Sequence, residues 1–260
     1  MTIRDRRVWV TGACSGIGEA LSYELAHRGA RLILSSNRPD ALREVRDRCP
    51  QPEKHHVRPL DLAEPASLQA AANAVHETAG AIDILVNNAG IAHHGPAATT
   101  EMETTRRVLE VNLLGAVQLT KAVLPSMIER QRGHVAVVSS VARKVGVPEL
   151  AAYAASKHAL HGWFDSLRAE VHDDNIGVTI ACPGFVQTSI AEHMSTADAT
   201  AAEKAVSKGI PPSDCAEALA DAIERDKAEF TVGGWETIAV YLKRFVPSLA
   251  RRLLRHAPGA

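Results

Sequence analysis

Short runs of β-branched and apolar residues alternate with longer amphipathic stretches along the whole chain. Apolar runs of about four to eight residues between turn signals are typical of buried strands, and apolar residues every three or four positions are typical of helices. This pattern predicts strands at residues 8–11, 31–35, 56–60, 82–87, 134–139, 178–182 and 229–232. It predicts helices at residues 16–28, 39–48, 65–79, 104–130, 152–172 and 213–225.

This order of elements predicts a single α/β domain over residues 1–260. Strands that alternate with helices form βαβ units, whose right-handed crossovers place helices on both faces of a parallel sheet. The fold class is therefore a Rossmann-type doubly wound sheet of seven parallel strands. A length of 260 residues suits one domain of this architecture.

Two segments depart from the alternation. Residues 185–212 are too long for an ordinary connection, and they are interpreted as a lid or substrate-binding loop. Residues 235–260 form a basic amphipathic tail, with nine bulky apolar residues among five Lys and Arg residues between 238 and 255. Residues 236–256 could lie on an anionic membrane surface. The preferred interpretation is a helix, bent near Pro247, that closes the substrate pocket or packs on another subunit.

Composition narrows the class of protein. Apolar residues make up 46% and charged residues 23%, and the formal net charge of −1 argues against a nucleic-acid partner. The four cysteines have no CxxC pair and no histidine at metal-ligand spacing, so reduced thiols and no metal site are expected: Cys14, Cys49, Cys182 and Cys215. The polar N-terminal residues and the lack of a long uninterrupted apolar run favour a cytoplasmic protein.

A glycine-rich turn, Thr11 to Gly18, lies between the first predicted strand and the first predicted helix. Glycines let the backbone approach a pyrophosphate, and the free amides at a helix N-terminus attract its negative charge. The alternative is a simple strand-to-helix turn. The phosphate-binding hypothesis assigns six positions of this turn to a cofactor: Gly12, Cys14, Ser15, Gly16, Ile17 and Gly18.

The spacing TGxxxGxG resembles the short-chain dehydrogenase/reductase family. Two further segments are similar to that family. Asn87-Asn88-Ala89-Gly90 resembles its NNAG motif, and the resemblance implies that Asn88, Ala89 and Gly90 line the cofactor site. Asp61-Leu62 matches the segment whose aspartate binds the adenine amino group. Asn87 as a turn residue and Asp61 as a helix N-cap are the alternatives.

Tyr153 and Lys157 are four residues apart in a predicted helix, so they share one face. A phenol titrates at about pH 10, and a neighbouring ammonium favours its ionised form. The pair therefore suits proton exchange, whereas the alternative is an exposed tyrosine beside a solvated lysine. The resemblance adds Ser140 and Asn112, and it implies a catalytic tetrad of Asn112, Ser140, Tyr153 and Lys157.

The same resemblance implies a role for each residue. Ser140 would bind the substrate oxygen, Tyr153 would exchange its proton, and Asn112 would hold a water through its main chain near Lys157. Further along, Pro183-Gly184-Phe185-Val186-Gln187-Thr188 resembles the family's PGxVxT segment. The resemblance implies contacts with the nicotinamide and pyrophosphate from Pro183, Gly184, Val186 and Thr188.

The residues after the second strand bear on the choice of cofactor. An acidic side chain there would favour NAD(H), but the sequence has Ser36-Asn37-Arg38. Arginine can bind a 2′-phosphate through its planar fork, so NADP(H) is favoured over NAD(H). The alternative is that Arg38 only caps or solvates the next helix.

The segment after Tyr153 resembles the branch of reductases that act on steroids, retinoids and other lipids, which implies a hydrophobic ketone, aldehyde or alcohol as substrate. Candidate pocket residues are His93, His94, Val145, Leu150, Phe185 and Met194. The resemblance also implies a homodimer or homotetramer. A cofactor-binding regulator without turnover, and an epimerase or dehydratase, stay open as alternatives.

Overall fold

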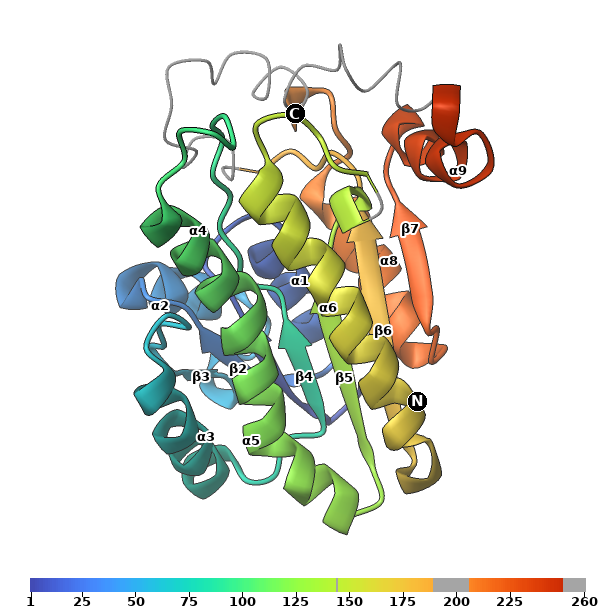
Figure 1. The fold of residues 1–260 in the computed structure, drawn as a ribbon. Coiled ribbons are helices and arrows are strands. Elements are labelled where there is room, and N and C mark those ends of the chain that lie inside the picture. Colours follow the sequence, from blue (N-terminus) through green and yellow to red (C-terminus); the bar gives the residue numbers. More distant parts are fainter. Residues whose placement is uncertain (144, 189–205, 250–260) are drawn as a thin grey trace.

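The computed structural model describes residues 1–143, 145–188 and 206–249. Seven strands form one parallel sheet in the order β3-β2-β1-β4-β5-β6-β7 (Figure 1). The strands are β1 (Arg7–Thr11), β2 (Arg31–Ser35), β3 (His56–Val57), β4 (Ile84–Asn87), β5 (Gly133–Val138), β6 (Ile176–Pro183) and β7 (Glu229–Val232). The doubly wound parallel sheet predicted from the sequence is confirmed.

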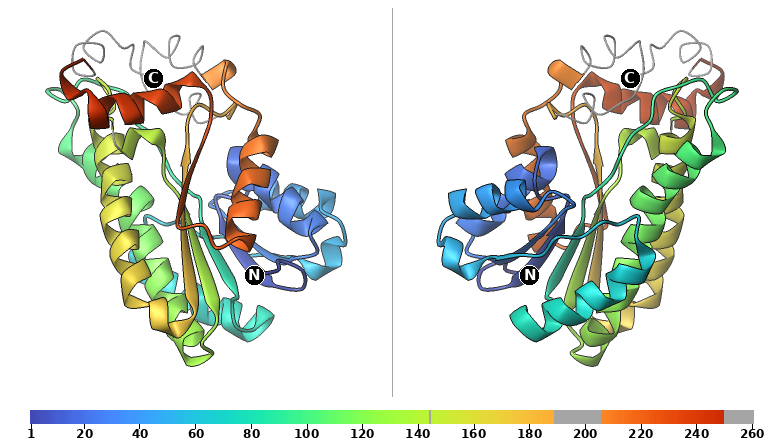
Figure 2. Two further views of the ribbon diagram at one scale, coloured as in Figure 1. Left: turned by 90° about the vertical axis from the view of Figure 1, so that its right-hand side faces the viewer. Right: turned by 90° about the vertical axis from the view of Figure 1, so that its left-hand side faces the viewer.

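The helices cover both faces of this sheet (Figure 2). They are α1 (Gly16–His27), α2 (Pro39–Arg48), α3 (Pro65–Ala79), α4 (Met102–Leu109), α5 (Gly115–Glu129), α6 (Ala151–Glu170), α8 (Pro212–Glu224) and α9 (Ile238–Phe245). One hydrophobic cluster joins the sheet to α3, α5 and α6, through residues such as Leu119 and Phe164. A second joins it to α1, α2 and α8, through residues such as Leu25 and Leu219. The described part of the chain is thus one three-layer domain.

β3 is shorter than the predicted strand at residues 56–60. Only His56 and Val57 are in strand conformation. Pairing nevertheless continues, because the N–H groups of Arg58 and Leu60 donate to the carbonyl oxygens of Leu34 and Ser36. Pro59 lies between them and has no N–H, so the regular ladder ends early.

The helix predicted at residues 104–130 is in fact two helices joined by a π-helical turn, Glu110–Leu114. In that turn the Gly115 N–H donates to the Glu110 carbonyl, five residues back. The helical run predicted here is confirmed, but apolar periodicity does not show the one extra residue in the π-helical turn. Among the described residues, Met102–Glu129 is also the helical run with the length and apolar content to cross a membrane. Core helices of soluble proteins share that property.

Several predicted features lie outside the described residues. These are residues 189–205 of the predicted lid, with Met194 among them, and residues 250–260 of the predicted tail. The two described ends of the lid pair with each other, because the Val186 backbone forms a parallel bridge with Ile210. The described part of the tail contains the short helix α9.

Candidate active site

The carboxyl ends of four adjacent strands, β1, β4, β5 and β6, meet at one edge of the sheet. β1 and β4 lie side by side, although one leads to β2 on one side and the other to β5 on the opposite side. Such a switch in strand order opens a crevice between the loops that follow the strands. The glycine-rich turn, Asn88, Ser140 and Pro183-Gly184 all follow these strands.

The glycine-rich turn depends on glycine at three positions. Gly12 and Gly16 have φ angles of +64° and +56°, a region that side chains disfavour. A Cβ atom on Gly18 would lie 2.2 Å from the Gly12 carbonyl oxygen. The turn therefore folds tightly on itself at the start of α1. The free amides at this helix N-terminus can bind an anion. Its residues fit a dinucleotide pyrophosphate, because a backbone without side chains at these positions can approach the phosphates closely.

Thr11 and Asn88 hold the turn against β4. The Thr11 hydroxyl donates to the Val86 carbonyl and accepts from the N–H groups of Asn88 and Ala89, at 3.0 and 3.1 Å. The Asn88 amide donates to the carbonyl oxygens of Thr11 and Gly12, at 3.0 and 3.2 Å. Asn88 and Ala89 are therefore brought to the turn, as the sequence resemblance implied. Their contact with a cofactor stays a prediction.

Arg38 folds back over the glycine-rich turn. Its Nη2 atom lies 3.1 Å from the Cys14 Sγ atom. The Ser36 hydroxyl accepts the Arg38 N–H at 3.1 Å, which sets the direction of the chain after β2. Ser36 is buried, whereas Asn37 and Arg38 are exposed. The exposed guanidinium of Arg38 thus lies beside the glycine-rich turn, and neither Ser36 nor Asn37 is acidic.

Asp61 has a structural role in this structure. Its Oδ1 atom accepts the Ala63 N–H at 2.9 Å, and its Oδ2 atom lies 3.4 Å from Arg107 Nη2. The first contact closes a turn, whereas the helix N-cap role considered for Asp61 is wrong, because the N-cap residue of α3 is Glu64. Asp61 keeps partial exposure at the cofactor edge, and Leu62 is buried in the core.

Tyr153 and Lys157 lie on one face of the first turns of α6. The Lys157 side chain is buried, its Nζ atom donates to the Val138 carbonyl at 2.8 Å, and it lies 5.6 Å from the centre of the Tyr153 ring. Burial lowers the pKa of Lys157 to about 8, and the nearby Cys182 opposes this shift. The ammonium is thus held next to the phenol ring.

Ser140 faces Tyr153 from the end of β5. Burial raises the pKa of the Tyr153 phenol, and its hydrogen bond with the Ser140 side chain acts in the opposite direction. The Ser140 Oγ atom also accepts the Ala142 N–H at 3.1 Å, which orients the hydroxyl. Ser140 and Tyr153 could therefore share one oxygen atom of a substrate.

Asn112 lies in the π-helical turn and is buried. Its side chain accepts the Ile91 N–H at 2.8 Å and donates to the Ile91 carbonyl at 2.9 Å and to the Ser156 hydroxyl at 3.0 Å. A Cβ atom on Gly90 would lie 3.2 Å from Asn112 Oδ1 and 3.6 Å from Lys157 Nζ. Asn112 and Lys157 thus flank Gly90, and the four residues implied by the resemblance converge.

Glu236 is a site residue that the sequence reasoning missed. Its buried carboxylate accepts the Phe185 N–H at 2.9 Å and the Gly234 N–H at 2.8 Å. A Cβ atom on Gly184 would collide with it. Glu236 therefore holds the backbone of the Pro183-Gly184 turn in place through these contacts. The only signal in the sequence is a lone acidic residue after Gly233-Gly234, which is too common to interpret.

The remaining predicted residues lie in the loop after β6 and among the candidate residues of the substrate pocket. A Cβ atom on Gly16 would lie 2.9 Å from Thr188 Cγ2, so the loop after β6 packs against the glycine-rich turn. His94 pairs with Glu149 at 3.2 Å, and His93 lies 3.4 Å from the Thr100 hydroxyl. The two histidines thus have local partners, and Val145 and Leu150 are buried.

Comparison with known proteins shows the family to which this chain belongs. The family described as short chain dehydrogenase matches residues 6–199. The chain belongs to the short-chain dehydrogenase/reductase family. It is 37% identical to dehydrogenase/reductase SDR family member 7B of Rattus norvegicus, over 97% of this chain and 81% of that protein. It is 44% identical to dehydrogenase/reductase SDR family member 7 of Homo sapiens, over 76% of this chain and 60% of that protein.

Solved structures of short-chain dehydrogenases share the fold. A family member from Burkholderia phymatum, in complex with NAD, has a TM-score of 0.87 at 24% identity and covers 96% of each chain. An alcohol dehydrogenase from Thermococcus sibiricus, complexed with 5-hydroxy-NADP, has a TM-score of 0.78 at 24% identity, covering 89% of this chain and 97% of that one. The protein thus has the fold of short-chain dehydrogenases, a fold that binds a nicotinamide cofactor.

Proposed function

We propose that this protein is an NADP(H)-dependent oxidoreductase that interconverts a hydrophobic ketone or aldehyde with the corresponding alcohol. The observation that supports this most directly is the convergence of Ser140, Tyr153, Lys157 and Asn112 beside the glycine-rich turn. A pure cofactor sensor has no need of a hydroxyl, a phenol and an ammonium at one point.

The chain's residues would divide the reaction as follows. A bound nicotinamide supplies or accepts a hydride. Ser140 donates a hydrogen bond to the substrate oxygen and stabilises the negative charge that develops there. Tyr153 gives its phenolic proton to that oxygen in reduction and takes it back in oxidation. The Lys157 ammonium favours the ionised phenol, and Asn112 holds a water through its main chain that returns protons from solvent.

Arg38 supports the choice of NADP(H). It is an exposed cation beside Cys14 of the phosphate turn, and a 2′-phosphate can accept two hydrogen bonds from a guanidinium. We expect Arg38→Ala to raise the KM for NADPH at least tenfold and to leave the KM for NADH nearly unchanged. Arg43→Ala, on the exposed side of α2, is the matched control. Equal effects on both cofactors would contradict the assignment.

A hydrophobic substrate is proposed because the segment after Tyr153 resembles reductases that act on steroids, retinoids and other lipids. Ile91 is partly exposed next to Asn112, and Val145 and Leu150 lie in the chain between Ser140 and Tyr153. Apolar residues near the tetrad would favour an apolar ligand over a sugar or an acid.

The decisive test is turnover with a panel of ketones, aldehydes and alcohols, ordered from steroids and retinoids to small ketones. We expect NADPH-dependent reduction that Tyr153→Phe abolishes without loss of cofactor binding. Tight NADPH binding with no turnover across the panel would instead favour the regulatory alternative. Product formation with no net change in cofactor oxidation would favour an epimerase or dehydratase.

We also propose a cytoplasmic homodimer or homotetramer in which α9 and the tail pack on the protein. α9 carries exposed apolar side chains at Ile238, Tyr241 and Phe245, which a second subunit or a bound substrate would cover. The competing partner is an anionic membrane, given the exposed Lys243 and Arg244. Co-sedimentation with phosphatidylserine vesicles, with and without residues 236–260, distinguishes them. Binding that depends on the tail would contradict packing.

A further inference from the structure

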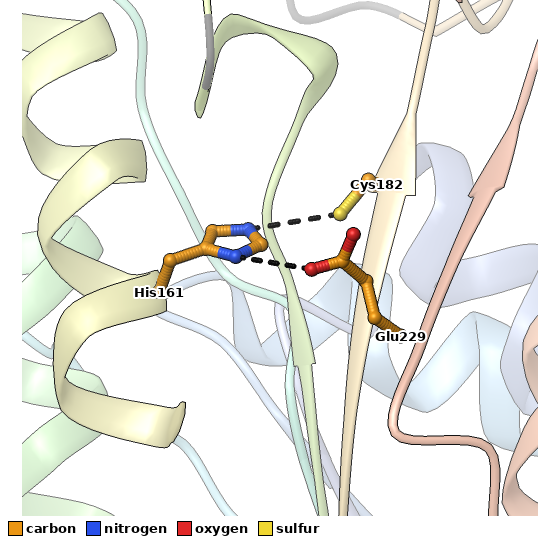
Figure 3. A group of neighbouring side chains, drawn as sticks. All are labelled: His161, Cys182 and Glu229. Atoms are coloured by element: carbon orange, nitrogen blue, oxygen red, sulfur yellow. Dashed lines mark hydrogen bonds and ion pairs between the residues drawn. The ribbon is translucent and has the colours of Figure 1, made fainter. Parts of the chain in front are cut away.

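Three side chains from distant parts of the sequence meet on the α6 side of the sheet (Figure 3). His161 comes from α6, Cys182 from β6 and Glu229 from β7. The His161 Nε2 atom lies 3.6 Å from Cys182 Sγ, and its Nδ1 atom lies 3.5 Å from Glu229 Oε2. A ligand atom from each residue lies within 4.8 Å of the other two.

A thiol, an imidazole and a carboxylate form a donor set that suits a thiophilic divalent cation. Zinc binds these groups at about 2.0–2.3 Å, so neighbouring ligand atoms in a tetrahedral site are about 3.5 Å apart. The Cys182-to-His161 separation already has this value. Glu229 is partly exposed and contacts the other ring nitrogen, so its carboxylate must turn toward the nitrogen that faces Cys182 to complete the site.

The backbone holds the donors on rigid elements. In the β6–β7 register, Ile180 pairs with Glu229 and Cys182 pairs with Thr231, so Cys182 and Glu229 project from one face of adjacent strands. His161 follows Lys157 by four residues on α6, on the face that packs against this part of the sheet. A site on two strands and a helix is more rigid than one built on loops.

The cluster also has an entry path. An open pocket of about 530 Å³ is lined by His158, Glu229 and Thr231, and by apolar and basic residues of α9, with Lys243 and Arg244 among them. Glu229 belongs both to this pocket and to the cluster, so a hydrated cation can reach the carboxylate first. The fourth coordination position would face the pocket and take a water molecule.

We propose that His161, Cys182 and Glu229 form a binding site for one Zn²⁺-like divalent cation, one helical turn beyond Lys157. The site is separate from the Ser140–Tyr153 pair and does not depend on the proposed reaction. Sequence spacing alone does not show it, because the ligands lie at positions 161, 182 and 229 and only the packing of α6 on β6 and β7 joins them.

The test uses the full chain, stripped of metal with a chelator and titrated with Co²⁺ as a spectroscopic probe. We expect one equivalent to bind and to give a thiolate-to-cobalt charge-transfer band that Zn²⁺ displaces. Cys182→Ser should abolish the band, and His161→Gln and Glu229→Gln should each weaken Co²⁺ binding at least tenfold. Cys49→Ser removes a buried thiol on the opposite face of the sheet and should leave the band intact.

A second readout does not use absorbance. Zn²⁺ should raise the Tm of the wild-type chain and of Cys49→Ser, but not that of Cys182→Ser, since a cation that binds only the folded state stabilises it. Cofactor binding by each variant shows that it is folded. A band that survives Cys182→Ser, the lack of any charge-transfer band, or equal Tm shifts in wild type and Cys182→Ser would overturn the proposal.

Discussion

At the scale of single residues, burial of the polar side chains determines how the site ionises. Lys157 is buried next to Tyr153, and burial penalises its charged form because the interior solvates an ammonium poorly. Its hydrogen bond to the Val138 carbonyl retains the charge at neutral pH. The pKa of Lys157 therefore lies close to neutral pH, so a small rise in pH removes its proton.

We expect the pH profile of kcat/KM for NADPH to show this ionisation. This parameter reports groups of the free enzyme, so it should fall above about pH 8, where Lys157 becomes neutral. In Lys157→Arg the guanidinium stays charged, so the fall in the residual kcat/KM should move to higher pH. A fall at the same pH in both enzymes would assign it to another group.

Glu236 leads to a second prediction at this scale. Glu236→Ala would leave the N–H groups of Phe185 and Gly234 without their acceptor, which should cost about 1–3 kcal/mol of folding stability. Because Phe185 follows the Pro183-Gly184 turn, the Kd for NADPH should rise as well. Glu236→Gln keeps an acceptor oxygen and should restore most of both. Unchanged cofactor binding in Glu236→Ala would show that the carboxylate only stabilises the fold.

At the scale of elements, glycines in different positions should respond oppositely to substitution. A Cβ atom on Gly18 in α1 would lie 2.2 Å from the Gly12 carbonyl oxygen, whereas one on Gly162 in α6 has nothing within 4 Å. Gly18→Ala must distort the phosphate turn, so we expect lower stability and a large loss of cofactor affinity. Gly162→Ala should raise the free energy of unfolding by about 0.5–1 kcal/mol, because alanine favours the helix.

Denaturant unfolding and cofactor titration by fluorescence measure both variants. Gly162→Ala also serves as the control for Gly18→Ala, since both add one methyl group to a helix. Cofactor binding by Gly18→Ala at wild-type affinity would contradict the tight turn described above.

At the scale of the whole molecule, buried histidines should make the fold sensitive to acid. Burial lowers the pKa of His134 to about 4 and also lowers the pKa of His55. Between pH 4 and about 6.5 the unfolded chain binds a proton at His134 that the folded chain does not, so stability rises with pH in this window. Moving from pH 7 to pH 5 should therefore cost about 2 kcal/mol through His134.

His134→Gln tests this assignment. The His134 Nε2 atom lies 2.9 Å from the Thr179 hydroxyl, which itself donates to the Lys227 carbonyl, so Nε2 must donate. A glutamine amide can replace that donor without titrating. Urea unfolding at pH 7, 6 and 5 should show a smaller loss of stability in His134→Gln than in wild type. Equal losses would place the acid sensitivity elsewhere.

Much of the fold and site follows from the sequence because it depends on local chemistry. Hydrophobic period and turn residues determine the strands and helices, and the handedness of the crossovers places helices on both faces of the sheet. The glycine-rich turn and the pair Tyr153 and Lys157 are recognisable because their function needs residues close in the chain. Parallel strand ends meet at one edge, so the motifs after β1, β4, β5 and β6 share one edge of the sheet in the folded chain.

Other features were decided only by the tertiary structure. The π-helical turn at Asn112 and the early end of β3 depend on how hydrogen bonds close, which hydrophobic period does not show. Glu236 and the cluster of His161, Cys182 and Glu229 join residues from separate elements, and their contacts exist only once α6, β6 and β7 pack together. Local patterns determine which elements form and where they lead. Packing decides which distant side chains meet, because it sets distances that no spacing along the chain contains.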